Sequence, residues 1–310
     1  MAPLVIYLLN VGQADASVIQ TPAGNLIVID AVSPKKLNDL LSQLRPDGEI
    51  AQLIITHPHD DHYRGADSLL DKFHVQRVTL APFWQEPGPS GYHAIINRLS
   101  ELQVPTRFLC GYERVYPDGG TYPDYEDSLV LELLGPSNNT LDQLAESATL
   151  EPNHLSIITR LCYGKFTMVF AADAQMENWQ HFDEEGLLEK KCSILRAAHH
   201  GSKRGSQWER IERLGPSLVV VSSDPNGEHD LPDLVGSAIF LEFSKQDGQA
   251  AVLTYTSGTI KIEVSDPGTS QRTITAFGES PDDLVFSGQP MPLPETDWAA
   301  LVETRLAAPA

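Results

Sequence analysis

The sequence predicts a layered α/β protein, and its length, its composition and its alternation of strand-like and helix-like segments support this prediction. A chain of 310 residues is long enough for one large domain or two modest ones. Apolar residues make up 41% of the chain and charged residues 21%, values typical of a globular protein. Apolar runs all fall short of the roughly 18–20 residues that a membrane helix needs, so we expect no membrane span.

Short apolar runs, each closed by Gly, Pro, Asn or Asp, predict a series of strands. In chain order these runs are residues 4–9, 17–20, 26–30, 53–56, 128–134, 156–161, 167–171, 193–198, 218–222 and 250–255. Helical spacing predicts helices over residues 34–44, 92–102, 178–190, 207–214 and 295–306. Helices placed between groups of strands are typical of a layered α/β architecture.

The predicted main domain covers residues 1–265. One segment inside this domain and one segment after it have a different pattern. Residues 82–91 are dense in Pro and Gly, so we expect residues 82–125 to be an insertion that rises from the scaffold. Beyond residue 264 the periodicity is lost, and residues 266–310 are expected to form a C-terminal appendage.

The charge and the cysteines limit the function classes. A formal net charge of −20 disfavours a protein that coats nucleic acid non-specifically, although it leaves room for a local basic surface. Cys110, Cys162 and Cys192 are few and far apart, which fits buried thiols in a reducing compartment. The amino terminus has neither a basic start nor a small-residue cleavage site, so a cytoplasmic protein is expected.

A dense cluster of metal-binding residue types follows the fourth predicted strand, where residues 57–62 read His-Pro-His-Asp-Asp-His. Zinc and similar ions bind neutral imidazole nitrogen and carboxylate oxygen, and a loop leaving a strand can point alternate side chains at one centre. His57 and His59 can therefore share one metal. Asp61 and His62 are adjacent and are expected to diverge toward a second position.

Three later features also lie at the ends of predicted strands. His154 precedes one strand, Asp173 follows the next, and the pair His199 and His200 follows a third. Open sheets place their sites at such ends. An Asp in this position can lend one oxygen to each of two metals.

This combination resembles the metallo-β-lactamase superfamily, whose His-x-His-x-Asp-His signature is matched by His57, His59, Asp61 and His62. Motifs at residues 10–16, 56–59, 171–173 and 198–202 are similar to those of the lactamase-fold domain of ComEC-type DNA-uptake proteins and their stand-alone relatives, over roughly residues 4–264. The chain departs from that pattern at Asn10, where Asp is frequent, and at Ala14 and Ala172, where Gly is frequent. The resemblance implies an αββα sandwich with a dinuclear metal site along one edge.

The resemblance also implies ligand sets for two divalent metal ions, with Zn²⁺ expected and Mn²⁺ as the alternative. The implied sets are His57, His59 and His154 for the first metal; Asp61, His62 and His200 for the second; and Asp173 as the bridge. His200 is preferred to His199 because it precedes Gly201, as the last histidine ligand does in other members, and His199 is then left to contact substrate. Many ComEC-like relatives have Asn at the position assigned here to His154, so the ligand role of His154 rests on the wider superfamily.

Hydrolysis is the expected reaction, because two divalent ions lower the pKa of a shared water toward about 7. Asp61 is expected both to ligate a metal and to orient the resulting hydroxide. Residues 190–213 carry seven basic and two acidic residues, which predicts a local basic mouth that attracts anions. Within it, Lys203 is placed to bind a phosphate, and His229 is a further candidate on the substrate side.

These features favour a phosphodiesterase or nuclease that acts on nucleic acid or another phosphodiester. One alternative is a hydrolase of a small phosphoester, such as a nucleotide or a phosphocholine-like headgroup, with Trp84, Tyr92 and Tyr125 as the floor of a compact pocket. An alternative of another class is a regulatory subunit of a bacterial defence or toxin-like system, which would bind a protein partner through the insertion or the C-terminal tail.

Overall fold

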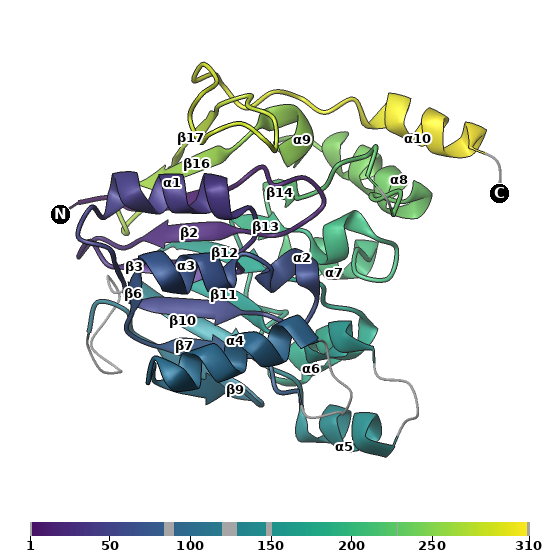
Figure 1. The fold of residues 1–310 in the computed structure, drawn as a ribbon. Helices are drawn as coiled ribbons and strands as arrows, with labels where there is room; N and C mark the ends of the chain where they lie inside the picture. Colours follow the sequence, from purple (N-terminus) through teal and green to yellow (C-terminus); the bar gives the residue numbers. More distant parts are fainter. Residues whose placement is uncertain (1, 84–89, 120–128, 147–150, 228, 309–310) are drawn as a thin grey trace.

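Two large β-sheets pack face to face in the computed structural model, and helices cover both outer faces (Figure 1). The structure describes residues 2–83, 90–119, 129–146, 151–227 and 229–308. Within these ranges the chain forms an αββα sandwich, which confirms the predicted fold class. Across the same ranges, each helix is too short or too polar to cross a lipid bilayer.

The first sheet has the strand order β17-β16-β1-β2-β3-β5-β7-β8. Its strands are β1 (Leu4–Leu8), β2 (Ser17–Gln20), β3 (Leu26–Ile29), β5 (Gln52–Ile55), β7 (Val78–Leu80), β8 (Thr106–Phe108), β16 (Ile260–Val264) and β17 (Thr273–Ala276). Strands β3, β5, β7 and β8 run parallel, so their C-terminal ends meet at one edge.

The second sheet has the strand order β15-β14-β13-β12-β11-β10-β9. Its strands are β9 (Tyr112–Val115), β10 (Leu129–Leu134), β11 (Ile158–Tyr163), β12 (Phe166–Phe170), β13 (Ile194–Arg196), β14 (Leu218–Val221) and β15 (Ala250–Leu253). Strands β12 to β15 run parallel, so this sheet also has an edge at which several strands end together.

Helices form the two outer layers. Those packed on the first sheet are α1 (Pro34–Leu44), α3 (Ala66–Lys72) and α4 (Ser90–Glu101), and those packed on the second are α6 (Met176–Glu184), α7 (Trp208–Leu214), α8 (Leu234–Ser244) and α10 (Trp298–Ala307). Shorter elements are β4 (Glu49–Ile50), β6 (His74–Val75), α2 (Asp60–Tyr63), α5 (Asn138–Glu146), α9 (Thr254–Ser257) and the 3₁₀ turns Pro152–Leu155 and Ala198–Gly201.

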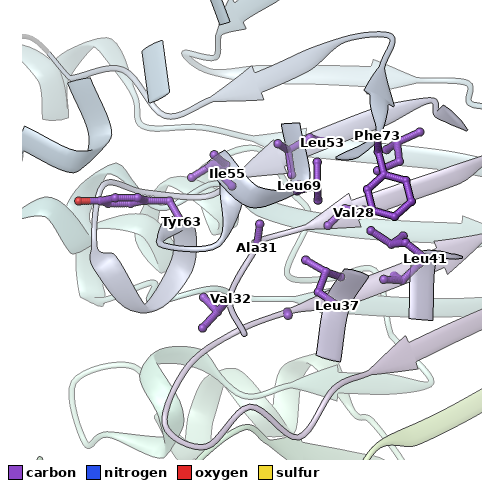
Figure 2. Packing of buried hydrophobic residues seen from close by; sticks show 14 of the residues in the cluster. Val28, Ala31, Val32, Leu37, Leu41, Leu53, Ile55, Tyr63, Leu69 and Phe73 are labelled. Carbon is purple, nitrogen blue, oxygen red and sulfur yellow. The ribbon is translucent and has the colours of Figure 1, made fainter. Parts of the chain in front are cut away.

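Three apolar clusters hold these layers together. Strand β1 shows how one strand serves two of them, because successive side chains point to opposite faces. Val5 and Tyr7 join the cluster beneath α1 and α3, part of which is drawn in Figure 2. Leu4 and Ile6 face the other sheet and join the central cluster. The third cluster lies between the second sheet and its helices.

Residues 82–125, expected to be an insertion, contribute to the layers themselves. Helix α4 covers the first sheet, β8 lies at the edge of that sheet, and β9 pairs with β10 in the second sheet. Helix α4, which begins at Ser90, is thus part of the outer layer on the first sheet. Residues 84–89 and 120–128 lie outside the described ranges.

The C-terminal segment, expected to be an appendage, is also integrated into the fold. Strand β17 extends the first sheet by pairing with β16. Glu279 is buried and forms an ion pair with the buried Lys36 at 3.5 Å. Trp298 is buried against Phe240, with 5.1 Å between the ring centroids. Single buried side chains anchor this segment, which is why it lacks a periodic apolar pattern.

Candidate metal centre

Metal-binding residue types converge where the parallel strands of both sheets end. Asp30 follows β3, and His57 follows β5 by two residues. In the second sheet Asp173 follows β12, while His199 and His200 follow β13. The sandwich brings both edges to one place, as open α/β sheets do at their binding sites.

One group of potential ligands consists of His57, His59 and Asp173, whose ligand atoms lie within 4.8 Å of one another. The His57 Nε2 atom is 3.2 Å from His59 Nδ1 and 3.8 Å from Asp173 Oδ2. Burial lowers the pKa of His57 well below its usual value, and it also lowers the pKa of His59. Both rings are thereby held in the neutral form that binds a metal.

The second group consists of Asp61, His62, Asp173 and His200. The His62 Nε2 atom is 3.2 Å from Asp173 Oδ1. The His200 Nε2 atom lies 3.3 Å from Asp61 Oδ2 and 3.5 Å from Asp173 Oδ1. Asp173 thus turns one carboxylate oxygen toward each group, in the arrangement expected of a bridging ligand.

Hydrogen bonds from the outer ring nitrogens fix the orientation of two imidazoles. His62 donates from Nδ1 to Asp30 Oδ2 at 2.8 Å, and His200 donates from Nδ1 to the Ser222 carbonyl oxygen at 2.8 Å. Asp30 is held in turn by the Thr56 backbone N–H at 2.8 Å and by its hydroxyl. Such outer contacts set the tautomer and direct Nε2 inward.

The inward atoms of the second group fit a divalent cation. His62 Nε2, His200 Nε2 and Asp173 Oδ1 are buried and have no hydrogen-bond partner among the described residues. Buried polar atoms left unpaired in this way call for an explanation such as an ion. Imidazole nitrogen with carboxylate oxygen is a donor set that suits zinc, iron and manganese.

The charge around the second group also suits a cation. Burial lowers the pKa of His200, but the carboxylates of Asp173, Asp61 and Asp15 outweigh it and raise that pKa to about 9. For the same reason the pKa of His62 lies well above its usual value despite burial. The carboxylates therefore concentrate negative charge at this point, which a divalent cation would neutralise.

The adjacent histidines reach different groups because of the backbone between them. His199 and His200 both adopt left-handed conformations, with φ of 49° and 51°. Such residues cost about 1–3 kcal/mol each and cluster at functional sites. The two rings diverge, with centroids 6.4 Å apart, and His199 Nε2 lies 3.6 Å from Asp173 Oδ2, on the side of the first group. Ala172, where relatives frequently have Gly, is also left-handed, with φ of 48°.

The structure does not bring His154 into the cluster, and the expected ligand role is corrected accordingly. Its Nε2 atom points toward the carboxylates of Glu177, at 3.3 Å, and Glu151, at 3.7 Å. The preceding residue, Asn153, faces the site instead, with its Nδ2 atom 3.4 Å from His199 Nε2. The 3₁₀ turn Pro152–Leu155 causes this difference, because it directs adjacent side chains to different sides.

The predicted basic mouth is largely neutralised by ion pairs. Within residues 190–213, the pairs with carboxylates are Lys190–Glu132, Arg196–Asp15, Arg204–Glu151, Arg210–Asp183, Arg213–Asp183 and Arg213–Glu189. Lys203 lies beside His154 in a separate cavity of about 440 Å³. The sequence count missed these pairs because their acidic partners are distant in the chain.

A cavity of about 910 Å³ opens onto the two groups. His229 lines it together with Asp61 and His199. Gln13, Tyr63 and Arg64 also line it, and our sequence analysis did not single them out. Gln13 lies within the motif at residues 10–16, and Tyr63 and Arg64 directly follow the motif at residues 57–62. This proximity to the motifs is the signal that could have identified them.

The aromatic floor expected for a small-phosphoester pocket is only partly described. Tyr92 is fully buried and donates its hydroxyl hydrogen bond to the Ala81 carbonyl oxygen at 2.8 Å, so it belongs to the core. Trp84 and Tyr125 lie outside the described residues.

Comparisons with known proteins agree with this geometry. A family model described as metallo-beta-lactamase superfamily matches residues 9–223. ComE operon protein 3 of Bacillus subtilis (strain 168) is 22% identical over 184 residues, which are 59% of this chain and 21% of that protein. The chain therefore spans about a fifth of the length of that curated relative.

Solved structures share the fold at low identity. CmlA, a diiron beta-hydroxylase from Streptomyces venezuelae, is 15% identical with a TM-score of 0.51, over 81% of this chain and 52% of that one. A metal-dependent hydrolase of the beta-lactamase superfamily is 16% identical with a TM-score of 0.50, over 85% of this chain and 100% of that one.

Proposed function

The chain belongs to the metallo-beta-lactamase superfamily, and from this premise we propose that it is a metal-dependent phosphodiesterase with two divalent ions around Asp173. The superfamily and the donor set together indicate a metal-dependent hydrolase. The observation that carries the proposal is the shared carboxylate, because Asp173 offers one oxygen to each of two ligand groups. Centres of this kind stabilise the attacking and leaving oxygens of a phosphoryl group.

We assign the residues that line the cavity to different roles in hydrolysis. When bound, the two ions would supply an activated water and would stabilise negative charge on the scissile group. Asp61 reaches into the cavity and would orient the attacking water. Arg64 and His229 line the same cavity, and each would donate hydrogen bonds to phosphate oxygens. His199 would contact the substrate beside the first ligand group.

Zn²⁺ is our proposed metal, with Mn²⁺ as the alternative. Nitrogen and oxygen donors also accept iron, so the metal must be identified by loading the protein with each ion separately.

A hydrolysis assay tests the proposed activity. Protein loaded with Zn²⁺ or Mn²⁺ is expected to cleave bis-p-nitrophenyl phosphate or single-stranded DNA, and the double variant Asp61→Ala, His62→Ala is expected to lose that cleavage. The loss should reach at least about 10³-fold, because two of the four potential ligands of the second group disappear. Asp67→Asn and His74→Ala, at exposed positions outside the cavity, are the matched controls and should keep wild-type rates. Activity that survives the double change would refute the assignment.

A second candidate, hydrolysis of a small phosphoester, is favoured by the size of the cavity. About 910 Å³ is within the range of sites that enclose small molecules. A net charge of −20 also opposes long polyanions. Rates on a polynucleotide and on a mononucleotide diester, measured at equal phosphodiester concentration, separate the two candidates.

A further inference from the structure

One wall of the cavity is a loop that joins β14 to α8. Residues 222–227 and 229–233 of this connection are described, and His229 and Leu231 line the cavity. On its other side the loop packs against the N-terminal motif. A Cβ atom added to Gly227 would lie 2.8 Å from Gln13 Oε1, and Gln13 lines the same cavity.

The guanidinium group of Arg305, on helix α10, joins the two ends of this loop. Its Nη2 donates to the Pro225 carbonyl oxygen at 2.8 Å, and its Nε donates to the Pro232 carbonyl oxygen at 3.1 Å. Its Nη1 donates to Asp230 Oδ1 at 2.9 Å, next to His229. The Arg305 side chain is only 10% exposed, and its bonds to the two carbonyl oxygens are partly buried, whereas the Asp230 side chain is 82% exposed.

Helix α10 is itself fixed to the second sheet. Trp298, in its first turn, is buried and donates from Nε1 to the Ala251 carbonyl oxygen at 2.8 Å. Asp297 caps the helix by accepting a hydrogen bond from the Ala300 N–H at 2.9 Å. Arg305 follows Trp298 by seven residues, about two helical turns, and therefore lies on the same side of α10. Figure 1 shows α10 at the C-terminal end of the chain, beside α8.

We infer that Arg305 is a positioning residue for the substrate cavity: helix α10 uses it to hold the loop that presents His229. The planar guanidinium suits this role, because its donors in fixed directions reach three acceptors at once. Only the part of the inference that concerns the substrate in the cavity rests on the proposed function. The mechanical part, that Arg305 restrains the loop, stands on the contacts alone.

Hydrogen exchange measured by mass spectrometry tests the restraint directly. In Arg305→Ala, amides between Pro225 and Pro232 are expected to exchange at least ten times faster than in the wild type. Peptides from β12 and from residues 57–62 should be unchanged. Glu303→Ala, at an exposed position of the same helix, is the matched control and should leave the loop unaffected. Unchanged exchange in the loop of Arg305→Ala would overturn the inference.

A conservative variant covers the case in which Arg305→Ala does not fold. Arg305→Lys keeps the charge but has one donor group, which cannot reach acceptors on both ends of the loop. We expect faster loop exchange in it as well, at an unchanged melting temperature. A loop as protected as in the wild type would contradict the inference.

Kinetics then separate positioning from chemistry. With bis-p-nitrophenyl phosphate, Arg305→Lys is expected to raise KM at least fivefold while kcat changes less than twofold and the metal content stays constant. An unchanged KM in a variant with a loosened loop would refute the link between the loop and substrate. If the wild type cleaves no phosphodiester, the proposed function fails, and the exchange experiment still decides the restraint.

Discussion

Side chains of the ligand groups are positioned by hydrogen bonds with residues outside those groups. Asp30 is the clearest case, because its carboxylate is buried and accepts hydrogen bonds from Thr56 and from His62 Nδ1. The second ligand group depends on this contact for the direction of His62 Nε2. Asp15 has a different role: it forms a buried ion pair with Arg196 at 2.7 Å.

Replacing Asp30 tests this dependence. Asp30→Ala is expected to weaken metal binding at the second group by about 10–100-fold, the usual cost of losing an outer carboxylate partner. Competition with a chromophoric chelator measures the affinity, and circular dichroism verifies that the variant is folded. Asp67→Asn serves as a matched carboxylate control at an exposed position. Wild-type affinity in Asp30→Ala would show that His62 needs no such partner.

The residue scale also shows where sequence reasoning ends. The spacing of His57, His59, Asp61 and His62 predicts their convergence, because the motif is local and follows one strand. His154 and Asn153 are neighbours, and only the turn of the backbone decides which of them faces the cluster. Composition and spacing carry no information about that turn.

Helices and strands can be predicted from the sequence where they have a clear apolar pattern. Helix α1 and strand β2 match their expected bounds because α1 has an apolar stripe and β2 is a short apolar run between turn residues. Helix α8 was missed, because its sequence LVGSAIFLEFS is apolar over most of its circumference and lacks a helical stripe. Short edge strands such as β8, whose residues are all exposed, also give no clear pattern.

Helix α8 matters to the site because it packs closely on the turn that carries His200. A Cβ atom added to Gly236 would lie 1.8 Å from the Gly201 carbonyl oxygen. Gly201 directly follows His200. The first turn of α8 therefore supports the backbone of the second ligand group, and this contact leaves no space for a side chain.

The direction in which Gly236→Ala changes the free energy of unfolding tests this contact. Alanine in a helix normally stabilises by about 0.5–1 kcal/mol relative to glycine. Here the clash is expected to lower the free energy of unfolding by about 2 kcal/mol or more, within the range for overpacked positions. Urea denaturation measures the change, and Val235→Ala, at the 48% exposed neighbouring position, should change it by less than about 0.5 kcal/mol. A Gly236→Ala variant as stable as the wild type would contradict the close packing.

At the scale of the whole molecule, the sandwich forms the site because it places the edges of two sheets next to each other. The first sheet contributes residues 57–62 and Asp30, and the second contributes Asp173, His199 and His200. The layered class follows from the order of strand and helix patterns in the sequence. The integration of residues 266–310 does not, because isolated anchors such as Trp298 and Glu279 leave no periodic signal.

The central claim is that the two ligand groups share Asp173 and bind a pair of divalent ions. The most direct measurement is the number of metal ions per chain, determined by native mass spectrometry after loading with Zn²⁺ and dialysis. We predict two ions for the wild type and for His154→Ala, and a loss of bound metal in Asp173→Ala. A wild type that binds no metal or a single ion, an Asp173→Ala variant that still binds two, or a His154→Ala variant that loses one would contradict the account.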